Sequence, residues 1–204
     1  MAVLSLLCFG MFIGNPCSLA RAQERTFRVI AGSSIQFISN APLERMTGSS
    51  RTVEGEFVLN PSDLSQIRGT IRVPIATLRT GIELRDEHLR GPSELDAARY
   101  PHAVFEPVRV EGARNLVPNQ VVRFVLVDRF SLHGVTRELR AEVQVRWMPA
   151  SDELRSQGIS GDLIRAQATF VVNLPDYGIY VNPFVRLKVS DNIRVNVTLR
   201  AASG

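Results

Sequence analysis

The sequence predicts an all-β fold, an antiparallel up-and-down β-barrel of about eight strands with one short helical crossover. Three observations favour this class. Apolar and polar residues alternate with a period of two through most of the chain, and turn residues separate the alternating segments. Between residues 79 and 101, helix-forming residues interrupt the alternation. A chain of 204 residues most simply holds one domain.

The segment from residue 137 to residue 147 alternates most clearly. One face carries Leu139, Ala141, Val143, Val145 and Trp147. Charged or amide side chains occupy every position between them. This one-sided pattern indicates an antiparallel sheet with one face in water. Closing such a sheet into a barrel removes its exposed edges, and a two-sheet sandwich is the alternative architecture.

The other predicted strands have similar lengths and follow one another locally. They cover residues 27–38 (a strand or a bulged pair, with the break at Gly32), 52–59, 66–73, 103–110, 121–132, 164–172 and 191–200. Residues 52–59 and 66–73 are expected to form an antiparallel hairpin. His133-Gly134 predicts a tight connection. Residues 41–50, 149–162 and 174–182 are expected to be loops or irregular structure.

The crossover begins where Thr80-Gly81 breaks the strand pattern. Residues 82–89 are rich in helix formers, and Gly91-Pro92 stops this helix. Ser93 is placed to cap a second short helix over residues 94–99, which Tyr100-Pro101 would end. A helical segment inside a β chain must pack on something, and the end of the barrel is the expected place.

Eight residues are predicted to point into the lumen, because polar residues alternate with them in the same strands. They are Phe57, Ile71, Ala141, Val143, Trp147, Ala168, Phe170 and Val195. A shift of one residue would put charged side chains inside, so the assignment is constrained. Small inward residues, among them Gly55 and Gly69, either leave room for a ligand or accommodate bulky neighbours in a filled core. The alternation itself does not choose between these two.

Three segments of the chain carry a resemblance to a known family. The first holds Thr80-Gly81, Arg85-Asp86, His88-Leu89 and Tyr100-Pro101, the second is residues 132–136, and the third joins residues 176–179 to residues 189–191. Their order and spacing resemble those of the YceI-like family of exported lipid-binding proteins. The chain departs from the family at Ser93-Glu94-Leu95, where aromatic residues are common, and at Leu174, where arginine is common.

The resemblance implies a lipocalin-like barrel with a long apolar lumen. It also implies a ligand such as a long-chain isoprenoid, a quinone-like molecule or another apolar amphiphile, held for transport, storage or scavenging. It leaves open a transient contact with a membrane and a homodimer. Two alternatives remain: an enzyme that uses polar residues of the crossover, and a stress or interaction protein with a filled barrel.

Residues 1–22 are predicted to be a signal peptide, followed by a lipid-binding domain over residues 23–204. An apolar run is followed by Ala20-Arg21-Ala22, which has the Ala-x-Ala spacing of a cleavage site, although no basic residue precedes the run. Cleavage is expected after Ala22, or else after Ala20. The mature protein is expected in the periplasm or outside the cell. Both cysteines lie in the leader, so the mature chain can form no disulfide.

The charge of the chain gives no indication of nucleic-acid binding. The formal net charge is +4, and removing the leader takes away one arginine and no acid, which leaves +3. The arginines alternate with apolar residues along the strands, as expected for a solvated face. We therefore expect no nucleic-acid partner.

Arg85, Asp86 and His88 are the polar residues of the crossover that could act together. We expect them to make structural links at the barrel rim, because no nucleophile motif accompanies them. The three histidines lack the spacing of a zinc site, and the mature chain has no cysteine to assist. We therefore expect no catalytic residues, no metal and no cofactor.

Overall fold

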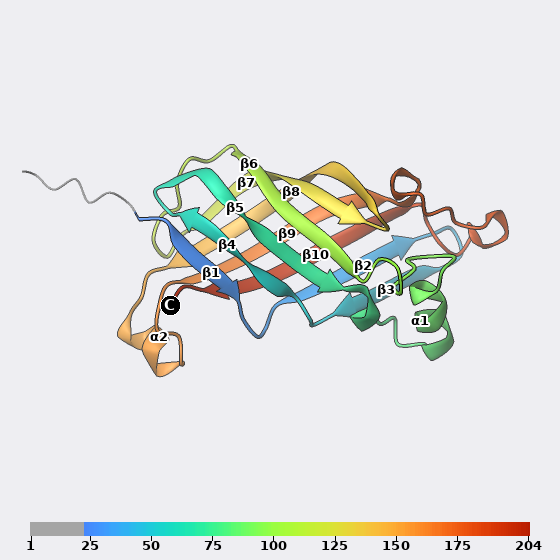
Figure 1. The fold of residues 1–204 in the computed structure, drawn as a ribbon, viewed down its shortest axis with the longest axis horizontal. Coiled ribbons are helices and arrows are strands. Elements are labelled where there is room, and N and C mark those ends of the chain that lie inside the picture. Colours follow the sequence, from blue (N-terminus) through green and yellow to red (C-terminus); the bar gives the residue numbers. More distant parts are fainter. Residues whose placement is uncertain (1–22) are drawn as a thin grey trace, which may run out of the picture.

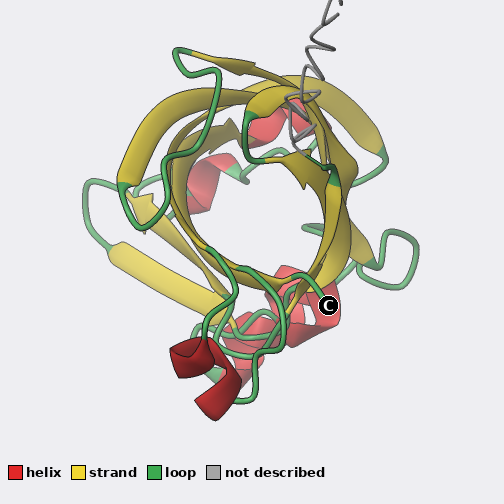
Figure 2. Ribbon diagram, turned by 90° about the vertical axis from the view of Figure 1, so that its left-hand side faces the viewer, coloured by secondary structure: helices red, strands yellow, loops and turns green. Residues whose placement is uncertain are grey.

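The computed structural model describes residues 23–204, which form a closed antiparallel β-barrel with two short helices. The predicted signal peptide lies outside the described residues. Seen along the axis, the strands form a continuous ring (Figure 2). The predicted fold class is confirmed. None of the helices in the described part is long and apolar enough to cross a membrane.

Ten strands make up the barrel wall. They are β1 (Arg25–Val29), β2 (Ser34–Asn40), β3 (Arg45–Ser50), β4 (Glu54–Asn60), β5 (Asp63–Pro74), β6 (His102–Glu111), β7 (Val121–Leu132), β8 (Val135–Met148), β9 (Leu163–Asn173) and β10 (Asn192–Ala202). The hydrogen-bonded order is β1-β4-β5-β6-β7-β8-β9-β10-β2-β3, and β1 also pairs with β10.

The ten strands form an eight-stranded barrel, because two of its strands are each broken in the middle. β1 and β2 both pair with β10, and on their other side they pair with β4 and β3. The break between β1 and β2 falls at Gly32, whose φ of 92° favours glycine. The Ser33 hydroxyl satisfies the interrupted ladder there, accepting from the backbone N–H of Arg200 at 2.9 Å. A bulged pair at this point was predicted and is confirmed.

The prediction of a loop over residues 41–50 is wrong, since β3 occupies its second half. Met46, Gly48 and Ser50 are buried, while the residues between them are exposed. The ring of Phe37 lies over Gly48, and a Cβ atom there would come within 2.0 Å of the Phe37 Cζ atom. The segment reads as a loop because glycine and serine occupy its inward positions.

The crossover holds one helix, not two. Helix α1 (Glu83–Arg90) matches the first predicted helix. Residues 91–100 form successive turns instead of a second helix, and Asp96 adopts a left-handed φ of 45°. The Ser93 hydroxyl contacts the Glu94 carboxylate at 3.4 Å instead of capping a helix. The predicted loop over residues 149–162 contains a short helix, α2 (Asp152–Ser156).

The two helices lie at opposite ends of the barrel (Figure 1). Short 3₁₀ turns Ile75–Thr77, Leu174–Tyr177 and Pro183–Val185 lie at strand ends and in the connection between β9 and β10. Most buried apolar side chains form one cluster in the barrel interior. A smaller cluster of Leu154, Ile159 and Leu163 packs at α2. The α1 end therefore shares the main core, whereas α2 has its own.

Candidate ligand-binding site

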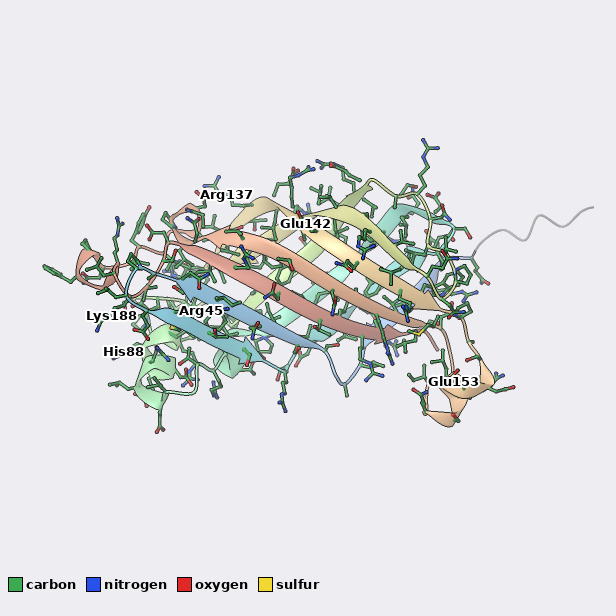
Figure 3. The ribbon with its side chains drawn as sticks, turned by 180° about the vertical axis from the view of Figure 1, so that it is seen from behind. Arg45, His88, Arg137, Glu142, Glu153 and Lys188 are labelled. Atoms are coloured by element: carbon green, nitrogen blue, oxygen red, sulfur yellow. The ribbon has the colours of Figure 1, made fainter. Side chains whose placement is uncertain are left out.

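An outer cavity of about 400 Å³ lies at the α1 end of the barrel. Its wall is mostly apolar and includes Ile35, Met46, Ile75, Leu95, Leu132, Ile179 and Val195. Its polar lining residues are Glu44, Arg85, His88, Glu94, Asn182 and Lys188. Figure 3 shows His88 and Lys188 at the same end of the molecule, opposite Glu153 of α2. The volume lies within the range of about 300–1,000 Å³ that is usual for ligand pockets.

A second, inner cavity of about 130 Å³ lies farther from α1 along the barrel. Ala141, Val143, Ala166, Ala168 and Phe170 are among its lining residues. Asp128 also lines it, and is the one ionisable side chain among the described residues that do so. Val73 lines both cavities, so they are neighbours within one lumen.

Three phenylalanine rings lie where the two cavities meet. Phe130 lines the outer cavity, whereas Phe105 and Phe170 line the inner one. The ring centroids of Phe105 and Phe130 are 4.5 Å apart, and those of Phe105 and Phe170 are 5.6 Å apart. These distances are typical of packed aromatic pairs. The aromatic cluster therefore forms an apolar constriction between the two cavities.

The end of the barrel far from α1, the α2 end, holds a buried apolar side chain and a hub of polar contacts. Leu116, in the loop between β6 and β7, is buried and lines the inner cavity. Asp162 is buried nearby and accepts hydrogen bonds from Trp147 Nε1 at 2.7 Å and from the Ala150 N–H at 2.9 Å. Arg25 pairs with the same carboxylate. Charge-assisted bonds of this kind fix the loops around the α2 end.

Helix α1 is tied to the mouth by its first turn. The Asp86 carboxylate is buried and accepts hydrogen bonds from the Thr80 N–H and hydroxyl, both at 2.6 Å. Burial raises the pKa of Asp86, but the bonds from Thr80 and the charges of Arg90 and Arg79 outweigh it and hold that pKa below its ordinary value. The carboxylate therefore stays ionised and holds the start of the helix.

Arg85 extends this link to the neighbouring barrel strand. Its guanidinium donates to the Glu44 carboxylate at 2.7 Å and to the Thr80 hydroxyl at 3.0 Å. Arg79 forms a backbone bridge to Ser49 of β3. The Thr80, Arg85 and Asp86 cluster therefore joins the crossover to the rim of the outer cavity.

The three segments that carried the family resemblance meet at this end. The rings of Tyr100 and His133 lie 4.8 Å apart, and His133 Nδ1 is 3.2 Å from the backbone oxygen of Tyr177. His133 and Gly134 both have positive φ, 50° and 76°, as a two-residue hairpin turn requires. A Cβ on Gly134 would lie 2.5 Å from the Tyr100 ring. Residues of the three motifs therefore pack against one another at this end of the barrel.

The structure places seven of the eight predicted lumen residues on the cavity walls. Phe57, Ile71, Ala141, Val143, Ala168 and Phe170 line the inner cavity, and Val195 lines the outer one. Trp147 lines neither, because its indole N–H turns to Asp162 at the α2 end. Among the crossover residues, Arg85 and Asp86 are bonded as described above. His88 is exposed, lines the mouth, and forms no side-chain hydrogen bond or ion pair within residues 23–204.

The small inward residues fall into two groups. Ala141, Ala166 and Ala168 line the inner cavity, so their size leaves room. Gly55 and Gly69 line neither cavity. A Cβ on Gly55 would lie 2.0 Å from the backbone oxygen of Thr70, so this glycine permits a close approach of two strands. The sequence pattern shows only that both groups are small inward residues, so it does not distinguish those that leave space from those that allow close strand contact.

Sequence reasoning missed Asp128 and the constriction formed by Phe105 and Phe130. A signal for Asp128 was present, because it shares the period-two face of Phe124, Leu126 and Phe130 in β7. A carboxyl on an otherwise apolar inward face is a departure from the pattern that the sequence alone shows. No such signal marked the constriction, which depends on rings from three strands.

Residues 29–201 match the YceI-like domain. The chain belongs to this family. A UPF0312 protein of Vibrio parahaemolyticus is 24% identical over 115 residues, which cover 56% of this chain and 58% of that protein. A UPF0312 protein of Vibrio campbellii matches to the same extent. The chain therefore aligns with little more than half the length of these two relatives.

Solved structures share the YceI-like fold at low identity. A polyisoprenoid binding domain from Saccharophagus degradans, implicated in plant cell wall breakdown, superposes with a TM-score of 0.66 at 15% identity, covering 89% of this chain and all of that one. BcnA of Burkholderia cenocepacia gives 0.65 at 13% identity, with coverages of 83% and 96%. The YCEI protein of Campylobacter jejuni gives 0.61 at 16%, with coverages of 77% and 84%.

Proposed function

We propose that this protein binds one elongated apolar ligand in the barrel lumen, such as a long-chain isoprenoid, a quinone-like molecule or a related amphiphilic lipid. The outer cavity carries the proposal, because it joins an apolar wall to a polar rim in a volume suited to a small molecule. The Saccharophagus degradans domain of the same fold is a polyisoprenoid binding domain, which supports this ligand class.

Burial of the ligand's apolar surface would supply the affinity. Each square ångström removed from water contributes about 25 cal/mol, or about 0.8 kcal/mol per CH₂ group. A chain of several methylene or isoprene units in the lumen therefore binds without directional chemistry. The rim residues Glu44, Arg85 and Lys188 then meet solvent or a polar group.

The enzyme alternative receives no support from the crossover. The Asp86 carboxylate is held by Thr80, and the Arg85 guanidinium is held by Glu44 and Thr80. Groups engaged in this way stabilise the rim.

The lumen proposal is tested by native mass spectrometry of the purified protein together with a filling variant. Ala168→Phe places a ring in the inner cavity. We expect it to melt cooperatively near wild type and to retain less copurified lipid. Val171→Phe, on the exposed face of the same strand β9, is the matched control and should retain wild-type lipid. Destabilisation by about 1–3 kcal/mol with no lipid in any form would show a packed barrel.

We also propose that the mouth touches a membrane surface when ligand is exchanged. Exposed apolar side chains stand on α1 and on the loops around the outer cavity: Leu43, Ile82, Leu84, Tyr180, Phe184 and Leu187. Phe184 is 94% exposed. Arg186 and Lys188 in the same loop would meet anionic headgroups, at about 1 kcal/mol each. An aromatic and basic rim suits the interface between acyl chains and headgroups.

Cosedimentation with vesicles of phosphatidylcholine and phosphatidylglycerol tests the membrane contact. Phe184→Ser should lower the bound fraction. Val108→Ser removes an exposed apolar residue from β6, away from the mouth, and should leave it unchanged. Equal binding by both variants and wild type would rule out this rim as the contact.

Export to the periplasm completes the proposal. It rests on the leader sequence, because an apolar run leads to Ala20-Arg21-Ala22. Sequencing of the protein from its host should begin at Gln23, or at Arg21 if cleavage follows Ala20. Cytosolic protein that retains Met1 would contradict export.

A further inference from the structure

Asp128 is a buried carboxyl without a partner in an otherwise apolar chamber. It lies in β7, is 4% exposed, and lines the inner cavity. Its side chain forms no hydrogen bond or ion pair with any other residue of the described part of the chain. Burying an unpaired carboxyl costs free energy that an apolar residue of similar size would not. The position therefore has a cost for folding that packing alone does not explain.

The neighbouring strands offer Asp128 neither a donor nor a counter-charge. Its register partners are Pro107 of β6 and Leu139 of β8. Both side chains are apolar, and proline has no N–H to donate.

The charged residues nearest in these strands are paired with one another. Arg109 bonds to Glu111 and Glu138, and Arg140 also bonds to Glu111. Arg129 pairs with Glu106. These ion pairs are largely exposed, on the side of the wall away from the lumen. Burial alone therefore acts on Asp128, and it raises the pKa of this carboxyl to about 7.

We propose that Asp128 recognises the polar head of the lumen ligand, which enters head first and places a hydroxyl or carbonyl group in the inner cavity. This inference rests on the proposed lipid-binding function. The apolar tail then lies across the phenylalanine constriction and fills the outer cavity. The ligand is an amphiphile with a small, uncharged head.

The size and chemistry of the inner cavity support this assignment. Its volume of about 130 Å³ resembles that of an apolar cavity of about 150 Å³ that holds a benzene ring. A protonated carboxyl donates to a carbonyl or hydroxyl oxygen, and an ionised one accepts from a hydroxyl. Near neutral pH, Asp128 has access to both forms. A bulky or multiply charged head would fit neither the volume nor the apolar wall.

Asp128 lies one inward position deeper in β7 than Phe130. Inward neighbours along a strand are two residues apart, which is about 6.8 Å. A head that passes the constriction therefore meets Asp128 as it enters the inner cavity. If only the tail entered, the carboxyl would remain unpaired against hydrocarbon, which is the unfavourable arrangement.

The test compares two probes that differ by one hydroxyl group, para-nonylphenol and nonylbenzene. Binding of each to the lipid-extracted protein is measured by titration calorimetry at about pH 7. We expect wild type to prefer the phenol by at least about tenfold. Asp128→Leu should abolish the preference, and Asp128→Asn should keep part of it. Leu126→Val is the matched control, because Leu126 lines the same cavity two residues away on the same face of β7.

The outcomes separate this inference from the lumen proposal. If wild type binds both probes equally, or Asp128→Leu keeps the preference, Asp128 does not recognise the head, although lumen binding stands. Loss of the preference in Leu126→Val as well would assign it to cavity shape and overturn the inference. If wild type binds neither probe, the lumen proposal and this inference both fail. Asp128→Leu removes a buried carboxyl and should fold at least as stably as wild type.

Discussion

The two ends of the barrel are made from the same alternating strands, yet they differ in how much space they enclose. At the α1 end, apolar walls surround about 400 Å³ and polar residues stand at the rim. Towards the α2 end, the inner cavity holds about 130 Å³, the buried Leu116 lines it, and Asp162 binds Trp147, Ala150 and Arg25. The difference shows that alternation sets which residues face inward, whereas loops and side-chain size decide whether the space is filled.

Buried aspartates have two different roles in this barrel. Asp162 and Asp86 are satisfied by protein donors, one at each end. Asp128 lies between them without a protein partner. The first two stabilise the architecture, and the third is available to a ligand. Substitutions at these three aspartates should therefore have different consequences.

Asp162→Ala should be the most destabilising change, by about 3–5 kcal/mol, because it removes the shared acceptor of Arg25, the Trp147 indole and the Ala150 N–H, at about 1–3 kcal/mol for each donor left unsatisfied. Urea unfolding followed by Trp147 fluorescence measures it. Asp152→Ala in the exposed part of α2 is the control and should change the free energy of unfolding by less than about 0.5 kcal/mol. A loss below about 1 kcal/mol for Asp162→Ala would show that the α2 end does not depend on this hub.

Asp128 should make the stability of the barrel depend on pH. Its pKa is about 7 in the folded protein and near 3.8 in the unfolded chain, so the folded state binds more protons between these values. The free energy of unfolding should therefore fall as pH rises from about 4 to about 7, by about 2–4 kcal/mol. Asp128→Asn should remove this slope in urea titrations at several pH values. An unchanged slope would place the titrating group elsewhere.

Asp86 and His88 lie two residues apart on α1 and should respond differently. Asp86→Ala should cost about 1–3 kcal/mol, because it leaves the Thr80 donors unpaired. The lowered pKa of Asp86 means that its contribution is present at neutral pH and is lost as pH falls through the folded-state pKa. Hydrogen exchange over residues 80–100 should quicken in this variant. Unaltered exchange would contradict an anchoring role.

His88→Ala should have the smallest effect, below about 0.5 kcal/mol, because its side chain is exposed and makes no hydrogen bond or ion pair among the described residues. A His88 side chain that anchored the helix at the barrel rim would give a larger loss of stability. Thermal melts of the two variants measured side by side test the contrast. A loss for His88→Ala as large as that for Asp86→Ala would assign the anchor to the whole helix.

Much of the barrel was predictable from local pattern. The hairpin of β4 and β5, the tight turn at His133-Gly134 and helix α1 follow from residue type and period. β3 was not predictable in this way, because Gly48 is explained only by the Phe37 ring across the ladder. The prediction of a second helix was wrong because the turns of residues 91–100 are hydrogen-bonded back to α1. The Ala97 N–H, for example, donates to the Arg90 oxygen at 3.0 Å.

Part of the candidate site was also predictable from local pattern, and part was not. The inward faces of β4, β5, β8, β9 and β10 were determined by alternation, since the side chains of a strand point to opposite faces in turn. Trp147 shares such a face, but its N–H bonds to an aspartate 15 residues later, and this removes it from the cavity wall. Asp128 was visible as a polar break in an apolar face, whereas its lack of a partner was not.

The sequence alone determined the fold class, the faces of the strands and the family resemblance, because each depends on residue type at fixed spacing along the chain. The packing of the folded barrel established that the lumen holds two cavities, that Phe105, Phe130 and Phe170 lie between them, and which aspartates are satisfied. The reason is physical. Free volume and hydrogen-bond partners depend on side chains from strands far apart in sequence, and closure of the barrel brings them together.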